Sequence, residues 1–314
     1  MTAVLVHRWL DAGELDLPVP GSGRTGSRWW KLAALTENDV VAGRLAEAHT
    51  DALAILSELD GPTPTADQLW GVWAAEAPQA VVSAGKGDDE RTLLTGIKAW
   101  CSGAAICTHA LITARCDDNG PGLYAVDLSQ DEVEVLADDW HNVGMRDSGT
   151  RSVRLSGAVG VPVGRPGDYL TRPGFWHGAI GVAACWFGGA RGVAAPLYRA
   201  LAERHDGSIP DAHALAHLGA VDAALAAAEA MLVSAACYVD AEPRGDRAEL
   251  IARRVRAVVE RAVDEAIVRT GRALGPGPLV LDARHAQRVA DLTIYVRQSH
   301  AERDLAALGK VAAR

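Results

Sequence analysis

Residues 92–104 read TLLTGIKAWCSGA and begin a series of predicted β-strands. Similar short runs of β-branched or alternating residues follow at residues 109–115, 123–128 and 151–161 (HALITAR, LYAVDL and RSVRLSGAVGV). Clusters of glycine, aspartate and asparagine, such as CDDNGPG, separate these runs. Strand after strand with tight turns is typical of antiparallel β-structure. We therefore expect a middle β-domain over residues 76–172.

The chain that follows this β-rich part is rich in alanine and has helical periodicity. Asp211 is placed to cap one predicted helix, and GPGP at residues 275–278 interrupts the chain before the last one. The predicted helices cover residues 176–204, 211–240, 247–273 and 284–308. We expect residues 173–314 to form a C-terminal four-helix bundle.

The chain that precedes the β-rich part also has helical character. Apolar residues recur at helical spacing from Ser27 to Leu59, with a break near Asn38 and Asp39. Residues 1–25 carry several prolines and glycines and are predicted to be irregular. We expect an N-terminal helical region over residues 1–75. Helices, then strands, then helices in separate runs predict the α+β class rather than alternating βαβ units.

The composition is that of a globular protein and limits the possible partners. The 314 residues include 31 lysines and arginines against 40 aspartates and glutamates, a net charge of −9. Nucleic-acid binding needs a basic face, so we expect no nucleic-acid partner. Five cysteines without CxxC spacing favour a cytoplasmic location. The longest uncharged stretch, between Arg172 and Arg191, contains a histidine and several glycines, which favours a buried helix over a membrane span.

Two motifs suggest ligand sites by their spacing alone. Gly21-Ser-Gly23-Arg-Thr-Gly26 matches the GxGxxG pattern of dinucleotide-binding proteins. Prolines in the preceding ELDLPVP are unsuited to the central parallel strand that this mechanism requires, so we interpret the motif as a glycine loop. His213 and His217 have a spacing that can bind zinc. No third ligand is suggested, so we favour a surface or interface pair and expect no metal.

Glu47, His49 and Asp51 place three polar side chains close together on a predicted helix that is otherwise apolar. A solvated stripe on the helix surface is the favoured interpretation. The alternative is the wall of a pocket, where Glu47 or His49 could act as a general base or contact a substrate.

Several segments together resemble the acyl-CoA dehydrogenase family. Residues 94–104 (LTGIKAWCSGA) are similar to a strand pair of that family, and residues 140–150 (WHNVGMRDSGT) are similar to the segment that closes its β-domain. Further similar segments are Val161-Pro162, residues 181–192, residues 203–210, and the loop at Leu274–Gly277 followed by a helix with Arg288 and Asp291. The resemblance covers roughly residues 92–300 and keeps the order helix, strand, helix.

The resemblance implies a flavin-dependent oxidoreductase that binds FAD as a homodimer or homotetramer. It implies that Trp100 packs on the flavin ring and that Ser102 bonds near flavin N5. Arg204 is the implied partner of the pyrophosphate, and His213 is near a position that contacts the cofactor. Gly275 and Gly277 are implied to let the backbone approach the adenosine half. The implied substrate is a small molecule or an acyl thioester.

Three departures from the family pattern leave the reaction open. The N-terminal region is short, the E-P-x-x-G-S-D signature is absent, and the segment that usually holds the catalytic glutamate is Arg297-Gln-Ser-His300-Ala301. Flavin-dependent monooxygenases of the same fold also lack the glutamate and place a histidine near the flavin, so His300 is the leading candidate base. Glu47 and His49 are the reserve candidates. The sequence therefore leaves open a dehydrogenase-like enzyme, a monooxygenase, or a flavin-free binding or assembly subunit.

Overall fold

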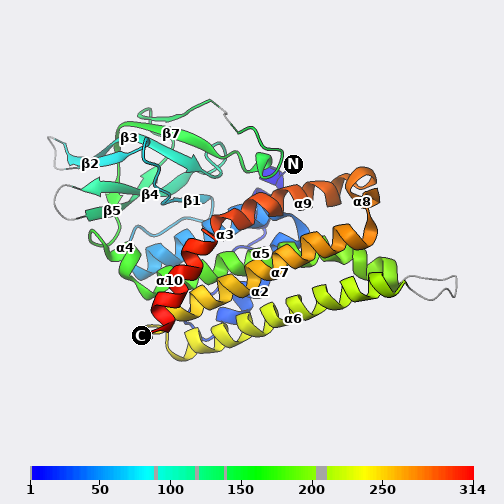
Figure 1. Ribbon diagram of the computed structural model, residues 1–314. Coiled ribbons are helices and arrows are strands. Elements are labelled where there is room, and N and C mark those ends of the chain that lie inside the picture. The colour runs from blue at the N-terminus through cyan, green and yellow to red at the C-terminus, as the bar shows by residue number, and fades with distance from the viewer. Residues whose placement is uncertain (1, 88–90, 117–119, 138–139, 203–210) are drawn as a thin grey trace. The chain divides into compact units, whose positions relative to one another are not determined.

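The computed structural model describes residues 2–87, 91–116, 120–137, 140–202 and 211–314. The chain divides into two compact units (Figure 1). The β-unit consists of Met1–Leu17, Leu45–His141 and Arg146–Phe175. The helical unit consists of Pro18–Arg44, Asn142–Met145 and Trp176–Arg314.

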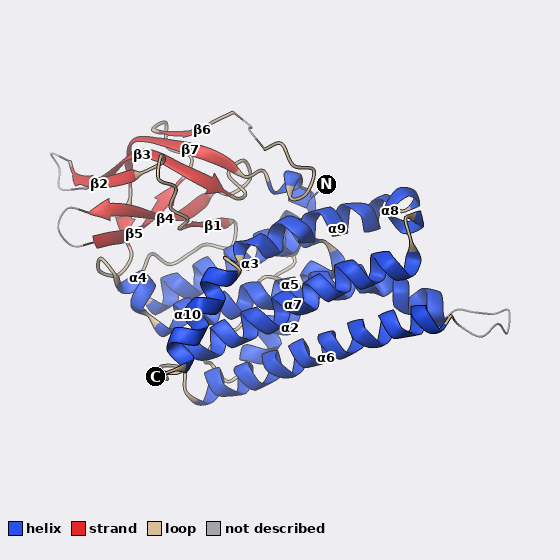
Figure 2. Cartoon of the chain, viewed as in Figure 1, coloured by secondary structure: helices blue, strands red, loops and turns tan. Residues whose placement is uncertain are grey.

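The β-unit is built on one mixed sheet, drawn in red in Figure 2. The strands are β1 (Trp70–Trp73), β2 (Val82–Lys86), β3 (Thr92–Cys101), β4 (His109–Cys116), β5 (Gly120–Asp127), β6 (Val133–Val135), β7 (Arg151–Val159) and β8 (Val161–Pro162). Their order is β6-β7-β3-β2-β4-β5-β8, with β1 paired to β4. Most pairs are antiparallel, as the sequence predicts, but β4 pairs in parallel with both β1 and β2. The predicted α+β class is confirmed.

Alternation along β4 places its side chains in two separate cores. Ile112 packs with Trp73 and Leu94 in the core enclosed by the sheet. Leu111 packs with Ile55 in a second core, which lies between the opposite face of the sheet and the second part of helix α3 (Val40–Glu58). Neighbouring residues of a strand point to opposite faces, so both faces of β4 are covered with apolar contacts. The short helices α1 (Thr2–Asp11), η1 (Arg146–Ser148) and α4 (Asp168–Thr171) complete the β-unit.

The helical unit holds the remaining helices, with α3 entering it only at its start and α5 from Trp176 onward. The helices are α2 (Thr25–Asn38), α5 (Pro173–Ala202), α6 (Ala212–Ala241), α7 (Ala248–Leu274), α8 (Gly277–Leu281), α9 (Ala283–Tyr295), η2 (Val296–Gln298) and α10 (Glu302–Ala312). Helices α6 and α7 lie side by side along their length (Figure 1).

The predicted helix boundaries are confirmed where a cap sets them. Helix α2 ends at Asn38, and Asp39 accepts a hydrogen bond from the backbone N of Ala42 at 2.8 Å, which begins α3. Asp211 caps α6 by accepting from the backbone N of Ala214 at 3.2 Å.

Two expectations about helices were wrong. Residues 1–25 are not irregular throughout, because α1 buries Val6 and Trp9. The predicted helix 284–308 is divided into α9, η2 and α10, since the chain turns at Ala301. The expected boundaries between residues 75 and 76 and between 172 and 173, and the four-helix bundle, stay predictions.

Candidate functional site

Trp100 lies on a β-bulge in the β-unit. Lys98 pairs with Val153 and Cys101 pairs with Arg151, so β3 has one more residue than β7 over this span. Trp100 takes up the extra residue with a φ of +57°, in the left-handed region that bulky side chains avoid. Such a conformation costs about 1–3 kcal/mol. The residue is 58% exposed, so burial does not offset that cost.

Ser102 ends a directed chain of hydroxyl groups. The Thr150 hydroxyl donates to Ser102 Oγ at 3.2 Å and lies 2.7 Å from Ser148 Oγ. A hydroxyl has a single proton, so the Ser148 hydroxyl must donate to Thr150. The Ser102 hydroxyl proton is therefore not used in the bond to Thr150, and it has no hydrogen-bond acceptor among the residues that the structure describes. Ser102 therefore offers a hydrogen-bond donor two residues after Trp100 in the chain.

The backbone at Ser102 and Gly103 is fixed by contacts within the β-unit. The Trp73 indole donates to the carbonyl of Ser102 at 3.0 Å. Gly103 has a φ of +74°, and a Cβ there would lie 2.9 Å from Cys107 Sγ and 3.1 Å from Leu45 of α3. Only glycine fits this turn, which holds the end of β3 against α3.

Glu47 and His49 are buried in the β-unit, which contradicts the favoured interpretation as a solvated stripe. His49 Nδ1 accepts from the backbone N of Trp70 at 3.2 Å, so this ring carries its proton on Nε2. The bond ties α3 to the start of β1. Periodicity suggested exposure because these residues interrupt an apolar helix, but the helix is covered on several faces. Both side chains therefore belong to an interior wall.

The turn that carries His300 is fastened to α7 of the helical unit. Ser299 donates to Glu260 Oε2 at 2.6 Å, and Arg256 donates to the carbonyl of Gln298 at 3.3 Å. Arg297 donates to Asp264 at 3.2 Å. Arg256, Glu260 and Asp264 are spaced four residues apart and so share one face of the helix.

His300 itself is exposed, with 63% of its side chain accessible. Its Nδ1 lies 3.5 Å from Asp304 Oδ1, and its backbone N donates to Asp304 Oδ2 at 3.0 Å. The first turn of α10 brings Asp304 back to residue 300. The next residue, Ala301, has a φ of 47° and a ψ of −116°, a conformation that favours glycine.

The remaining predicted cofactor residues lie in the helical unit or outside the described residues. Gly275 ends α7 with a φ of +66°, and among the described residues no atom beyond the chain neighbours lies within 4 Å of where its Cβ or that of Gly277 would be. His213 is exposed in the first turn of α6. Among the described residues, no group of three possible metal ligands includes it. Arg204 lies outside the described residues.

No protein-family model and no curated protein sequence matches the chain, but solved structures do. A nitrososynthase from Micromonospora carbonacea var. africana matches with a TM-score of 0.81 at 20% identity, over 98% of this chain and 88% of that one. TdsC from Paenibacillus sp. A11-2, solved with FMN and indole, matches at 0.78 and 21% over 91% and 82%. Butyryl-CoA dehydrogenase from Megasphaera elsdenii matches at 0.79 and 16% over 90% and 81%. The chain has the acyl-CoA dehydrogenase fold.

Within the acyl-CoA dehydrogenase fold, two of the motifs found in the sequence meet each other. Met145 N donates to Asp291 Oδ1 at 2.6 Å, and a Cβ on Gly144 would lie 2.2 Å from the carbonyl oxygen of Ala290. Gly144 and Met145 therefore dock on α9, and glycine is required at the contact. The sequence contained both motifs but no signal that they touch.

Sequence reasoning missed several residues that organise the site. Thr150 and Ser148 were part of a quoted motif, yet only the pairing of β3 with β7 shows that they point to Ser102. Glu260 had a detectable signal, since it belongs to a charged stripe with four-residue spacing on α7.

Proposed function

We propose that the protein is a flavin-dependent oxidoreductase that acts on a small organic or acyl-thioester substrate. The observation that carries this proposal is the strained backbone and exposed side chain of Trp100, followed two residues later by the hydroxyl donor of Ser102. Strained residues persist where function requires them, and an aromatic face next to a hydrogen-bond donor fits a flat heterocycle. The chains that share the fold include TdsC with bound FMN, which supports the same assignment.

The residues present fit a flavin. The Trp100 face would stack against the ring, and the Ser102 hydroxyl would donate to a ring atom. When bound, a flavin supplies two-electron transfer and reactivity toward oxygen. We propose FAD as the form bound, with Arg204, His213, Gly275 and Gly277 at the diphosphate and adenosine half. If the protein binds FMN and not FAD, these four residues lose their proposed role at the diphosphate and adenosine half.

His300 is the residue that we propose as the acid–base group. Imidazole side chains exchange protons near neutral pH, and His300 is exposed with its Nδ1 3.5 Å from Asp304 Oδ1. Glu47 and His49 remain the reserve candidates on α3. Substitution His300→Gln keeps a hydrogen-bond donor but removes titration, so turnover should fall about 10²–10⁴-fold while the flavin stays bound.

Two reaction classes are compatible with a histidine at position 300. An acyl-CoA dehydrogenase needs a base at the substrate α-carbon, whereas oxygen transfer requires a proton donor near the flavin. A histidine in place of the glutamate favours the monooxygenase alternative. Incorporation of ¹⁸O from ¹⁸O₂ into the product would identify a monooxygenase, and an unsaturated product without label would identify a dehydrogenase.

The visible absorption spectrum of the purified protein tests flavin binding directly. We expect saturable binding of FAD or FMN, with the flavin bands shifted on addition of wild-type protein. A Trp100→Ala variant with wild-type stability should bind more weakly. A protein that leaves the spectra of both flavins unchanged would instead support the flavin-free binding or assembly subunit.

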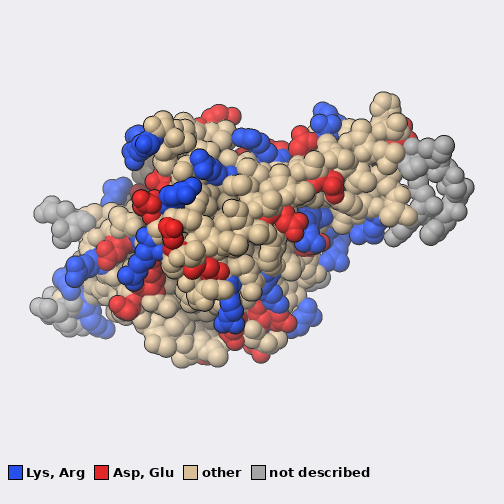
Figure 3. All heavy atoms as spheres, turned by 90° about the horizontal axis from the view of Figure 1, so that it is seen from below, with Lys and Arg blue, Asp and Glu red and all other residues tan. Residues whose placement is uncertain are grey.

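We further propose that the protein is a homodimer or homotetramer. Helices α5 and α6 are both long and apolar enough to cross a membrane by length and composition. In α5 most of the apolar window is buried, whereas only 33% of the α6 window is buried. Figure 3 views the side on which α6 lies in Figure 1 and shows wide uncharged areas between interspersed acidic and basic groups. A second copy would cover this apolar face.

Light scattering at micromolar concentration measures the assembly, and a monomeric mass would contradict the proposed oligomer.

All five cysteines are free thiols in the structure, which supports the expected cytoplasmic location.

A further inference from the structure

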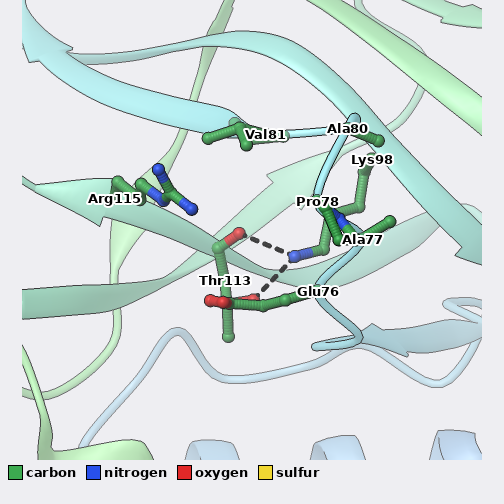
Figure 4. Close-up of a pocket in the computed structure, with 9 residues that line it drawn as sticks. Glu76, Ala77, Pro78, Ala80, Val81, Lys98, Thr113 and Arg115 are labelled. Atoms are coloured by element: carbon green, nitrogen blue, oxygen red, sulfur yellow. Dashed lines mark hydrogen bonds between the residues drawn. The ribbon is translucent and has the colours of Figure 1, made fainter.

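A cavity of about 390 Å³ lies in the β-unit, apart from Trp100 and Ser102. Three segments line it: the chain from Glu76 to Val82 after β1, Lys98 on β3, and Thr113 with Arg115 on β4. Trp100 and Ser102 are not among the described lining residues. Figure 4 shows the side chains of Glu76, Lys98 and Arg115 converging on the same space.

Lys98 lies at the base of this cavity and is only 3% exposed. Its Nζ donates to the carbonyl of Thr113 at 3.0 Å and to the Thr113 hydroxyl at 2.7 Å. An ammonium group has three protons, and the third has no acceptor among the residues that the structure describes. Burial lowers the pKa of Lys98, because the charged form is poorly solvated there. An anion in the cavity would stabilise that charge.

Arg115 and Glu76 lie on the outer part of the same cavity. Both side chains are exposed. Neither Arg115 nor Glu76 forms a hydrogen bond or an ion pair with the residues that the structure describes. With Lys98 and Arg115 positive and Glu76 negative, the three groups sum to one positive charge. A guanidinium that points into a cavity without a partner is suited to a planar or tetrahedral anion, which it binds through two parallel hydrogen bonds.

We propose that this cavity binds a small organic anion that carries a carboxylate or phosphoryl group and a hydroxyl donor. The Arg115 fork and the third Lys98 proton take the anionic group, and the Glu76 carboxylate accepts from the hydroxyl. The apolar side chains of Pro78 and Val81 contact the carbon skeleton. The volume equals about a dozen waters at about 30 Å³ each, and it lies within the usual range of small-ligand sites.

Isothermal titration calorimetry on the full chain at low ionic strength tests the proposal with three probes. Glycerol 3-phosphate and 3-hydroxybutyrate represent the two anionic classes, and glycerol is the uncharged control. We expect saturable one-site binding of at least one anion and no binding of glycerol. Binding of the phosphate alone or of the carboxylate alone assigns the class of ligand. Absence of saturable binding for both anions at 20 mM overturns the proposal, as does equal binding of glycerol.

Three variants assign the binding to this cavity. Arg115→Gln should raise the dissociation constant about ten- to a hundredfold, because the substitution removes a charge-assisted contact. Glu76→Gln should leave binding the same or stronger, since it removes a nearby negative charge. Arg154→Gln is the matched control, because Arg154 is a surface residue of β7 paired with Glu134 outside the cavity. Wild-type affinity in Arg115→Gln would overturn the assignment. None of these measurements requires a flavin, so they are independent of the proposed redox function.

Discussion

The Ser299 hydroxyl donates to Glu260 Oε2 at 2.6 Å and ties the chain immediately before His300 to α7. The same serine oxygen accepts from the backbone N of Ala301 at 3.1 Å. One hydroxyl therefore holds both sides of the histidine, and the acid on α7 orients that hydroxyl. Glu260 is thus a positioning residue for His300, although it lies 40 residues earlier in the sequence.

Replacing Glu260 should release this turn. In Glu260→Ala, hydrogen–deuterium exchange of a peptide covering residues 296–303 should become about tenfold faster, because a hydrogen bond to a charged group is lost. In Glu260→Gln, the amide oxygen can still accept from Ser299, so exchange should stay close to wild type. Peptides from α6 are the internal control. Equal exchange in Glu260→Ala and wild type would mean that the turn is held by other contacts.

Ala301 has a backbone conformation that glycine adopts without strain. Ala301→Gly should therefore raise the free energy of unfolding by about 1 kcal/mol, measured by urea denaturation. Ala306→Gly is the matched control within α10, where glycine should lower it by about 0.5–1 kcal/mol. A loss of stability in both variants would show that Ala301 is not strained.

Trp100 combines backbone strain with an exposed side chain. Trp100→Gly should raise the free energy of unfolding of the flavin-free protein by about 1 kcal/mol and at the same time weaken flavin binding. Trp100→Phe keeps a β-carbon and an aromatic face, so its stability should match wild type and its flavin affinity should be intermediate. Thermal unfolding and flavin fluorescence titration measure the two effects. A less stable Trp100→Gly variant would contradict the assignment of strain.

Asp240 explains why the GxGxxG sequence is a structural loop. Its carboxylate accepts from the backbone N atoms of Gly23 and Thr25, both at 3.0 Å, and from the Thr25 hydroxyl at 2.5 Å. It supplies acceptors and a negative charge at the start of α2. Asp240→Ala should lower the free energy of unfolding by about 2 kcal/mol. Asp246→Ala, an exposed control, should change it by less than about 0.5 kcal/mol. Similar stabilities of the two variants would contradict this role.

Lys98 should make stability depend on pH in a predictable direction. Burial lowers its pKa in the folded chain below the usual value of 10.5. Between the two values the unfolded chain binds a proton that the folded chain does not, so the contribution of Lys98 to the free energy of unfolding rises with pH. The difference in stability between wild type and Lys98→Met should therefore grow in favour of wild type as pH rises toward 10.5. Urea denaturation at several pH values measures it, and a constant difference would contradict it.

The sequence by itself determined the features that depend on neighbours along the chain. Periodicity predicted the α+β order and a break near Asn38 and Asp39, Asp211 identified a helix start, and the prolines before Gly21 indicated a glycine loop. These features follow from backbone hydrogen bonds and caps within a few residues, which is the range over which sequence patterns are informative.

Only the tertiary structure decided which side chains the candidate site brings together. The bulge at Trp100 depends on the register between β3 and β7, and the hydroxyl chain to Ser102 depends on the same pairing. Burial of His49 depends on what covers α3, and the cavity at Lys98 depends on segments from three places in the sequence. Such contacts form between residues far apart along the chain. Their geometry is set by strand register and packing, which local periodicity does not encode.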